Sequence, residues 1–141
     1  MQKNDKFIVK IEDMGIEGEG IAKIDGQVVF VPFALTNEEV EIQIIYLKSK
    51  FAIGKILNIL KPSPLRVVAP CPYFTKCGGC DIQHINYENQ LILKHTNLVN
   101  TLKKIGGINF SVEPVFPCKN PFNYRNKIAL PVVFQNGRTV V

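Results

Sequence analysis

Three cysteines lie within ten residues, in Cys71-Pro-Tyr-Phe-Thr-Lys-Cys77-Gly-Gly-Cys80, which has the spacing C-x5-C-x2-C. The two glycines permit a tight turn that lets the three sulfurs converge, and they leave backbone amides free to point at a sulfur-bound cluster. Three thiolates with one further ligand suit an iron–sulfur cluster or a structural zinc ion. Zinc sites usually contain two separated ligand pairs, so this spacing favours iron–sulfur; zinc and three reduced structural thiols are the alternatives.

The spacing leaves the fourth ligand open. Cys118 is the remaining cysteine and follows Cys80 by 38 positions, whereas His84 follows it by four. A single cysteine such as Cys118 is equally consistent with a free thiol.

The composition excludes several protein classes. Hydrophobic residues make up 46% of the 141 residues and charged residues 21%, which excludes wholesale disorder. The longest apolar run, Val28 to Leu35, contains Pro32 and is far shorter than the roughly 20 residues of a membrane-spanning helix. The polar N-terminus predicts no secretory signal, and cysteines in such a chain favour a reducing compartment. We therefore expect a cytoplasmic monomer that does not contact membranes.

Charge is distributed unevenly along the chain. Residues 1–61 contain eight lysines and nine acidic residues, whereas residues 62–141 contain nine basic and three acidic residues. The second part therefore carries a net charge of +6, against −1 for the first. A basic region of this size is either ordinary solvated surface or a surface for an anionic partner, and charge alone leaves both interpretations open.

The first 61 residues are predicted to form five short strands. The segments Ile21–Ile24 and Val28–Val31 flank Asp25-Gly26, a strong two-residue hairpin signal. Further strands are predicted at residues 7–11, 40–46 and 51–60, with a bulge or bend at Gly54. Five short strands cannot bury both faces of a flat sheet, so we expect a mainly β chain that begins with a small closed barrel.

A proline-rich segment separates this barrel from the rest of the chain. Three prolines fall within residues 61–70, which excludes a helix or central strand there. We therefore predict a barrel over residues 1–61, a semi-rigid linker over 62–70 and a second unit over 71–141.

One helix is predicted in the second unit, from about Tyr87 to Ile105. Asn86 is its candidate N-cap, and Gly106-Gly107 is its stop signal. Its buried stripe is expected to consist of four residues: Leu91, Leu98, Leu102 and Ile105.

A hairpin is predicted at the end of the chain. A strand over Lys127–Phe134 leads to Asn136-Gly137, a type I′ turn signal, and Arg138–Val141 begins the return strand. A domain rarely ends within such a short strand, so we expect these residues to be part of a longer protein.

These segments together resemble the RNA uracil-5 methyltransferases, enzymes that make 5-methyluridine in ribosomal or transfer RNA. Residues Gly18 to Phe33, followed by Val40-Glu-Ile-Gln-Ile, are similar to a TRAM domain, an OB-like RNA-binding barrel. Residues Cys71 to His84 are similar to the iron–sulfur segment of the family, and Pro121-Phe-Asn-Tyr-Arg-Asn-Lys127 resembles its Y-R-N-K motif. The resemblance implies that this motif starts an α+β central domain.

The resemblance also implies cofactors and their ligands. It places a [4Fe–4S] cluster on Cys71, Cys77 and Cys80, with a fourth cysteine beyond Val141; Cys118 precedes the Y-R-N-K motif and does not match that ligand. It implies S-adenosylmethionine in a C-terminal domain of the full-length protein, where a cysteine attacks C6 of the uracil and a glutamate helps to remove the C5 proton. We expect no catalytic residue and no S-adenosylmethionine contact in these 141 residues, which should be inactive alone.

RNA is the expected partner. OB-type barrels bind single strands through aromatic stacking and basic side chains. Lys48 and Lys50 in the barrel, and Arg125 and Lys127 in the basic second unit, are the candidate RNA contacts. Four aromatics could stack on bases, although we expect most of them to form barrel core: Phe30, Phe33, Tyr46 and Phe51.

Two functions fit these residues. The first is the RNA-recognition and cluster-binding portion of a methyltransferase. The alternative is a stand-alone RNA-binding module with a structural zinc or iron–sulfur site and no catalytic activity. A catalytic domain and a further cysteine after Val141 are required by the first function alone.

Overall fold

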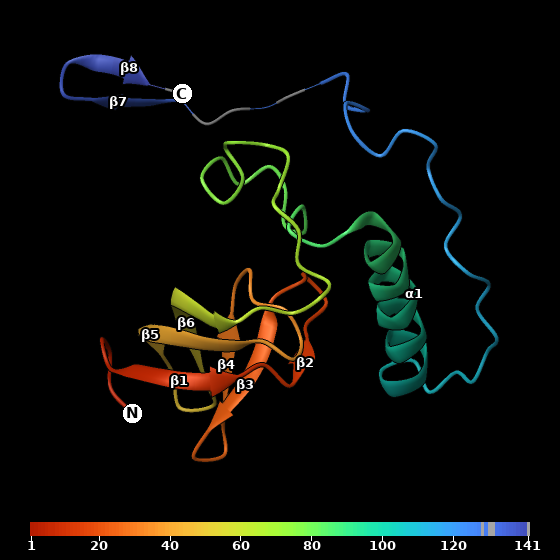
Figure 1. The fold of residues 1–141 in the computed structure, drawn as a ribbon, viewed down its shortest axis with the longest axis horizontal. Helices are drawn as coiled ribbons and strands as arrows, with labels where there is room; N and C mark the ends of the chain where they lie inside the picture. Colours follow the sequence, from red (N-terminus) through yellow and green to blue (C-terminus); the bar gives the residue numbers. More distant parts are fainter. Residues whose placement is uncertain (128, 130–131, 141) are drawn as a thin grey trace.

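The computed structural model describes residues 1–127, 129 and 132–140, and six of its strands form one sheet. These strands are β1 (Lys6–Lys10), β2 (Asp13–Met14), β3 (Gly20–Ile24), β4 (Gln27–Val31), β5 (Glu39–Leu47) and β6 (Phe51–Lys61). The strand order is β1-β5-β6-β4-β3-β2, and the β4–β6 pair is parallel whereas the other pairs are antiparallel (Figure 1).

The segment between β1 and β2 closes this sheet into a barrel. The Ile11 amide donates to the Glu38 carbonyl (2.9 Å), and the Glu12 amide donates to the Ile21 carbonyl on β3 (2.8 Å). The mainly β fold and the closed barrel are therefore confirmed. The structure has one strand more than the five predicted. This strand is β2, whose two residues pair with β3 where the barrel closes.

Small aliphatic side chains fill the barrel. The buried cluster contains ten residues: Val9, Ile11, Ala22, Val29, Val31, Ala34, Val40, Ile42, Ile44 and Ala52. Burial of each larger side chain contributes about 1.5–3 kcal/mol. None of the four predicted core aromatics belongs to this cluster, and Tyr46 is 43% exposed, so that prediction was wrong. The interior of so small a barrel is already filled by β-branched residues and alanine.

Local turn signals produced the expected geometry. Asp25 (φ 49°) and Gly26 (φ 81°) both lie in the left-handed region, as a type I′ hairpin requires. Next to Gly54 the β5–β6 register shifts between Ile44 and Tyr46, which is the predicted irregularity. A Cβ on Gly54 would lie 2.7 Å from Ile42 Cδ1, so the close approach of β5 requires glycine there.

The helix α1 (Tyr87–Lys104) has the predicted ends. The Asn86 side-chain oxygen accepts a hydrogen bond from the Asn89 amide at 3.0 Å, which is a regular N-cap. At the other end Ile105 is the C-cap, and Gly107 adopts a φ of 64° just beyond it.

The predicted buried stripe of α1 was wrong. No residue of this helix, all of which the structure describes, is buried; Leu98 is 48% exposed, and the C-cap residue Ile105 is 81% exposed. The helix instead turns a mainly polar face toward β2 and Leu35, across a cavity of about 200 Å³. That face consists of Asn89, Ile92, Leu93, Thr96, Asn97 and Asn100. Its amides and hydroxyls interact favourably with water, and the barrel core is already closed without the helix.

The C-terminal hairpin consists of β7 (Val133–Gln135) and β8 (Arg138–Val140) and lies apart from the barrel (Figure 1). Asn136 and Gly137 form the predicted turn, with φ of 52° and 76°. The strand predicted to start at Lys127 is described from Val133, and Lys127 and Ala129 lie outside regular structure. Residues 128, 130, 131 and 141 of the predicted hairpin lie outside the described residues. Among the described helices, none is long and apolar enough to cross a membrane.

Candidate metal centre and nucleic-acid interface

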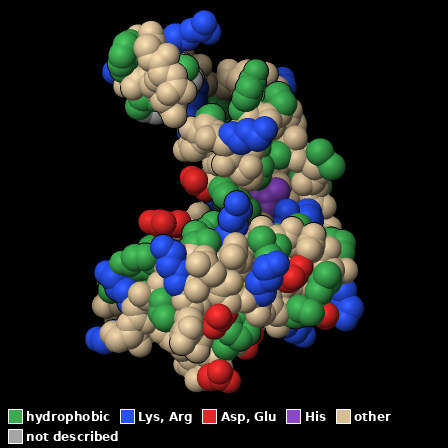
Figure 2. All heavy atoms as spheres, turned by 90° about the vertical axis from the view of Figure 1, so that its left-hand side faces the viewer, with side chains coloured by type: hydrophobic (Ala, Val, Ile, Leu, Met, Phe, Trp, Pro, Cys, Tyr) green, Lys and Arg blue, Asp and Glu red, His purple; other side chains and the backbone are tan. Residues whose placement is uncertain are grey.

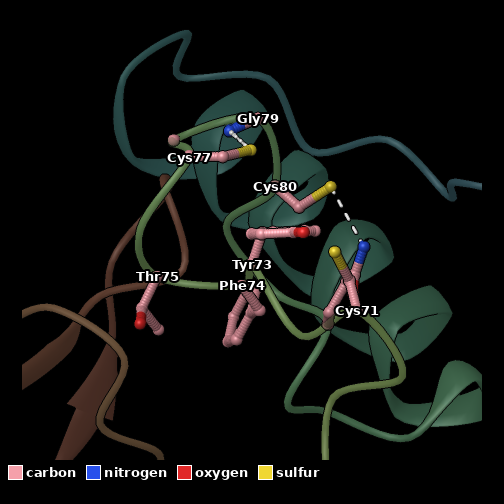
Figure 3. A pocket seen from close by; sticks show the side chains of 9 residues that line it. Cys71, Tyr73, Phe74, Thr75, Cys77, Gly79 and Cys80 are labelled. Carbon is pink, nitrogen blue, oxygen red and sulfur yellow. Dashed lines mark hydrogen bonds between the residues drawn. The ribbon is translucent and has the colours of Figure 1, made fainter. Parts of the chain in front are cut away.

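The three clustered cysteines line one small pocket in the loop that precedes α1 (Figure 3). Two backbone hydrogen bonds fold this loop: the Phe74 amide donates to the Cys71 carbonyl (3.1 Å) and the Cys77 amide to the Tyr73 carbonyl (3.1 Å). Gly78 continues the turn with a φ of 69°, which a glycine adopts without strain. All four cysteines of the chain are free thiols.

Two of these sulfurs accept hydrogen bonds from amides. The Gly79 backbone amide donates to Cys77 Sγ (3.3 Å), and the Gln83 side-chain amide donates to Cys80 Sγ (3.1 Å; Figure 3). Amide donors beside a ligand sulfur stabilise its thiolate form and orient it. The donor set around this pocket therefore fits a thiolate-bound iron–sulfur cluster or metal ion.

The sulfurs are not gathered into a finished coordination site. Within residues 1–127, 129 and 132–140, no group of three or more Cys, His, Asp or Glu side chains has an arrangement that could hold a metal ion. Cys118 does not line the pocket; its amide donates to the Tyr87 hydroxyl (2.7 Å), and its thiol donates to the Asn120 carbonyl (3.3 Å). The fold thus brings Cys71, Cys77 and Cys80 to one pocket and leaves Cys118 outside it.

An ion pair joins the proline-rich segment to the barrel. The Arg66 guanidinium donates to both oxygens of Glu38, at 2.5 and 2.8 Å, and to the Phe33 carbonyl at 2.7 Å. Glu38 is fully buried and also accepts the amides of Leu35 and Ser63. Burial alone would raise the pKa of Glu38, but these hydrogen bonds and the charge of Arg66 hold it below its ordinary value of 4.5.

A cluster of three rings continues this junction into the cysteine loop. His84 is 3% exposed and packs against Phe33 from the barrel and Phe74 from the loop, with ring centroids 6.0 and 5.3 Å away. Neither ring nitrogen of His84 has a hydrogen-bond partner among the described residues. Burial, assisted by the Arg66 charge and opposed by Glu38, lowers the pKa of His84 from 6.5 to about 4. The imidazole is therefore neutral at pH 7 and serves as an apolar packing group.

The loop between β5 and β6 presents Lys48 and Lys50 to solvent. Lys48 Nζ lies 5.6 Å from the Tyr46 ring centroid and 5.9 Å from that of Phe51. Phe30 adds an edge-to-face contact with Phe51 at 5.7 Å. This aromatic and basic surface could stack on bases and contact phosphates. Elsewhere, Figure 2 shows basic and acidic side chains interspersed over the barrel face.

The other two candidate RNA contacts lie in the second unit. Arg125 Nη2 donates to the Gly79 carbonyl (2.8 Å), so this guanidinium lies at the cysteine loop. Lys127 is exposed. The structure therefore places Arg125 beside the candidate metal site and Lys48 with Lys50 on a barrel hairpin, as separate surfaces.

Comparisons with known proteins agree with this architecture. Residues 2–57 match the TRAM domain family. This chain carries a TRAM domain. The chain is 44% identical over 138 residues to a protein of Clostridium tetani named as an uncharacterized RNA methyltransferase. This match covers 98% of this chain and 30% of that protein. A protein of the same description from Halalkalibacterium halodurans is 40% identical and covers 97% of this chain.

One solved structure is similar to about three quarters of this chain. The tRNA (uracil-54, C5)-methyltransferase of Pyrococcus abyssi, solved with S-adenosyl-L-homocysteine, has a TM-score of 0.52 and 28% identity over 76% of this chain and 23% of that protein. The resemblance to the N-terminal portion of RNA methyltransferases is thus confirmed. The chain spans about 30% of the length of the curated relatives it matches.

Three residues at the site escaped the sequence analysis: Glu38, Arg66 and Gln83. Glu38 lies in the segment Thr36-Asn37-Glu38-Glu39 of the barrel, and the composition of this segment is typical of an exposed polar turn. Arg66 is 28 positions away, and nothing local pairs the two residues. The available signal was a lone arginine between Pro64 and Pro70.

Proposed function

We propose that this chain is the N-terminal, RNA-binding and iron–sulfur-binding portion of an S-adenosylmethionine-dependent RNA uracil-C5 methyltransferase. The observation that carries the proposal is the attachment of the cysteine loop to the TRAM domain, through the Arg66–Glu38 pair and the packing of Phe74 and His84 on Phe33. Similarity to RNA methyltransferases over 98% of the chain supports it. The proposed organisation is a barrel over residues 1–61, a connecting segment over 62–70 and a cluster-binding unit over 71–141.

In this proposal Cys71, Cys77 and Cys80 hold a [4Fe–4S] cluster, with the fourth thiolate coming from outside these residues. When bound, the cluster provides iron–sulfur bonds that tie the loop together. The Gly79 and Gln83 amides stabilise the ligand sulfurs, at Cys77 and Cys80. The docked loop in turn holds Phe74 against the barrel, so the cluster has a positional role in this part of the protein.

The proposed role of the TRAM domain is to hold single-stranded or loop RNA. Tyr46 and Phe51 offer ring faces for stacking, and Lys48 with Lys50 neutralises phosphates. Lys127 adds positive charge in the second unit. Methyl transfer from S-adenosylmethionine belongs to the remainder of the protein, and the substrate RNA is expected to be ribosomal or transfer RNA.

Anaerobic preparation of the chain, with an external thiol as fourth ligand, tests the cluster. We expect iron and sulfide in equal amounts together with the visible absorption of an iron–sulfur chromophore. Serine at Cys71, Cys77 or Cys80 should abolish both, whereas Cys118→Ser should retain them. Stoichiometric zinc without iron under these conditions would contradict the cluster and favour a zinc-binding module.

The complete protein tests the reaction. Incubation with unmodified RNA and labelled S-adenosylmethionine should yield 5-methyluridine on nucleoside analysis, and the 141-residue chain alone should yield none. Methylation of another base or ring position would contradict the uracil-C5 assignment. RNA binding without any methyl transfer would favour a stand-alone RNA-binding module.

A further inference from the structure

Two side chains hold the turn formed by Cys77, Gly78, Gly79 and Cys80 from opposite directions. We infer that Gln83 and Arg125 are positioning residues that preset this turn for ligand binding and tune the cluster it holds. Gln83 follows the turn by three positions, whereas Arg125 reaches it from 46 positions beyond Gly79. The inference rests on the proposed iron–sulfur function and assigns it two residues that are not ligands.

The environment of the Gln83 amide supports this role. Its nitrogen donates to Cys80 Sγ at 3.1 Å, while its oxygen is buried and has no hydrogen-bond partner among the described residues. An unpaired buried acceptor costs about 1–3 kcal/mol, so this side chain is a poor choice for stability alone. A ligated thiolate can only accept hydrogen bonds, and the amide nitrogen is the group that faces it. Gln83 is therefore oriented as a donor to a ligand sulfur.

Arg125 holds the other side of the turn. Its Nη2 donates to the Gly79 carbonyl at 2.8 Å, while the amide of the same glycine donates to Cys77 Sγ at 3.3 Å. A Cβ on Gly79 would lie 3.3 Å from that sulfur and 3.5 Å from Arg125 Nη1, so glycine leaves both contacts undisturbed. The guanidinium thus holds the carbonyl of the same glycine whose amide donates to the neighbouring ligand sulfur.

Charge gives both contacts a measurable consequence. Three thiolates concentrate negative charge on an exposed loop, and reduction of a bound cluster adds one more electron. Amide donors at the sulfurs and a nearby guanidinium favour the more negative state, which raises the reduction potential. Loss of either contact should therefore lower the potential as well as the retention of iron.

The test compares Gln83→Met, Gln83→Glu and Arg125→Ala in the anaerobically reconstituted chain with external thiol. Methionine keeps the length of Gln83 without a donor, and glutamate keeps its shape with an acceptor instead. Arg138→Ala, in the separate β7–β8 hairpin, removes an equal charge and is the matched control. Iron content, the half-life of the visible chromophore in air and the potential from a dithionite titration are measured for each.

We expect both Gln83 variants and Arg125→Ala to lower the potential and to shorten the half-life several-fold, with Gln83→Glu the most severe. Arg125→Lys should restore the potential in part, because it returns the charge, and Arg138→Ala should match the wild type. Urea unfolding of the cluster-free chain should be unchanged, which separates positioning from a general loss of stability.

Unchanged potentials and half-lives in variants that hold a full cluster would overturn the inference and leave the proposed function standing. If Arg125→Ala keeps the cluster intact but weakens RNA binding, Arg125 is an RNA contact and its positioning role fails. A wild-type chain that takes up no iron and sulfide would overturn the proposed cluster itself, a result distinct from either of these.

Discussion

The Arg66 guanidinium donates two hydrogen bonds to the buried Glu38 carboxylate, from Nε to Oε1 at 2.5 Å and from Nη2 to Oε2 at 2.8 Å. The same guanidinium donates to the carbonyl of Phe33, whose ring packs against the cysteine loop. One arginine therefore ties the barrel, the proline-rich segment and the loop together. The hydrogen bond between the Val67 amide and the His84 carbonyl (2.9 Å) extends this connection.

Removal of the arginine should be costly. Arg66→Ala leaves the fully buried carboxylate of Glu38 without its counter-charge, for which about 3–5 kcal/mol of unfolding free energy is expected to be lost. Urea denaturation of the chain measures the loss. Lys61→Ala is the matched control, because it breaks a lysine–glutamate pair with Glu39 that is largely exposed and worth about 0–1 kcal/mol. Equal, small effects of both substitutions would contradict the role assigned to the buried pair.

Stability should fall with acidification in two stages. The folded pKa of His84 is about 4 against 6.5 in the unfolded chain, so unfolding takes up a proton between these values. The unfolding free energy should therefore be highest above pH 6.5 and lose roughly 3 kcal/mol as the pH falls to about 4. The folded pKa of Glu38 is also lowered, so its contribution is lost below about pH 4.5, as the pH falls through its folded pKa.

Substitution of His84 separates the two stages. His84→Leu cannot take up the proton, so its stability should be nearly flat between pH 6.5 and 4.5 and should fall only below that range. Urea midpoints measured across this pH range, at constant ionic strength, give the comparison. An unchanged slope in the His84→Leu variant would place the proton uptake on another group.

RNA binding should depend on the β5–β6 loop and on salt. Reversal of both Lys48 and Lys50 to glutamate removes two candidate phosphate contacts, which should weaken single-stranded RNA binding several-fold. The slope of log affinity against log salt should also become shallower by about 1.4. Fluorescence anisotropy at several salt concentrations measures both quantities. The double reversal of Lys6 and Lys10 on β1 changes the net charge equally, and an identical effect there would show that only overall charge matters.

The N-cap of α1 should be unusually important because the helix buries no residue. Asn86→Ala removes the acceptor for the Asn89 amide and should cost about 1 kcal/mol, seen as fraying of the first turn. Far-ultraviolet circular dichroism during thermal unfolding measures the helix content. Asn86→Ser retains an oxygen at the cap and should restore most of the signal. Equal helix content in the alanine variant would show that tertiary contacts alone hold this end.

Features that depend on neighbouring residues were predictable from the sequence. The turns at Asp25-Gly26 and Asn136-Gly137 and the cap at Asn86 follow from backbone preferences of the residues themselves. The barrel followed from five strand-like segments too short to form a stable flat sheet. The grouping of Cys71, Cys77 and Cys80 around one pocket followed from their separation by only a few residues.

Features that depend on distant partners were decided by the tertiary structure. Glu38 and Arg66 are individually typical surface residues, and they become a buried pair only because barrel closure and the rigid segment bring them together. The face that α1 turns to the barrel depends on the position of β2, so helical periodicity alone selected the wrong stripe. Arg125 was predicted to contact RNA because of its charge, and its contact with Gly79 comes from the path of the chain, which the sequence does not indicate. The charge of a side chain and its position in a helical repeat indicate which kinds of partner it can contact. The fold determines which of those partners lies close enough for the contact to form.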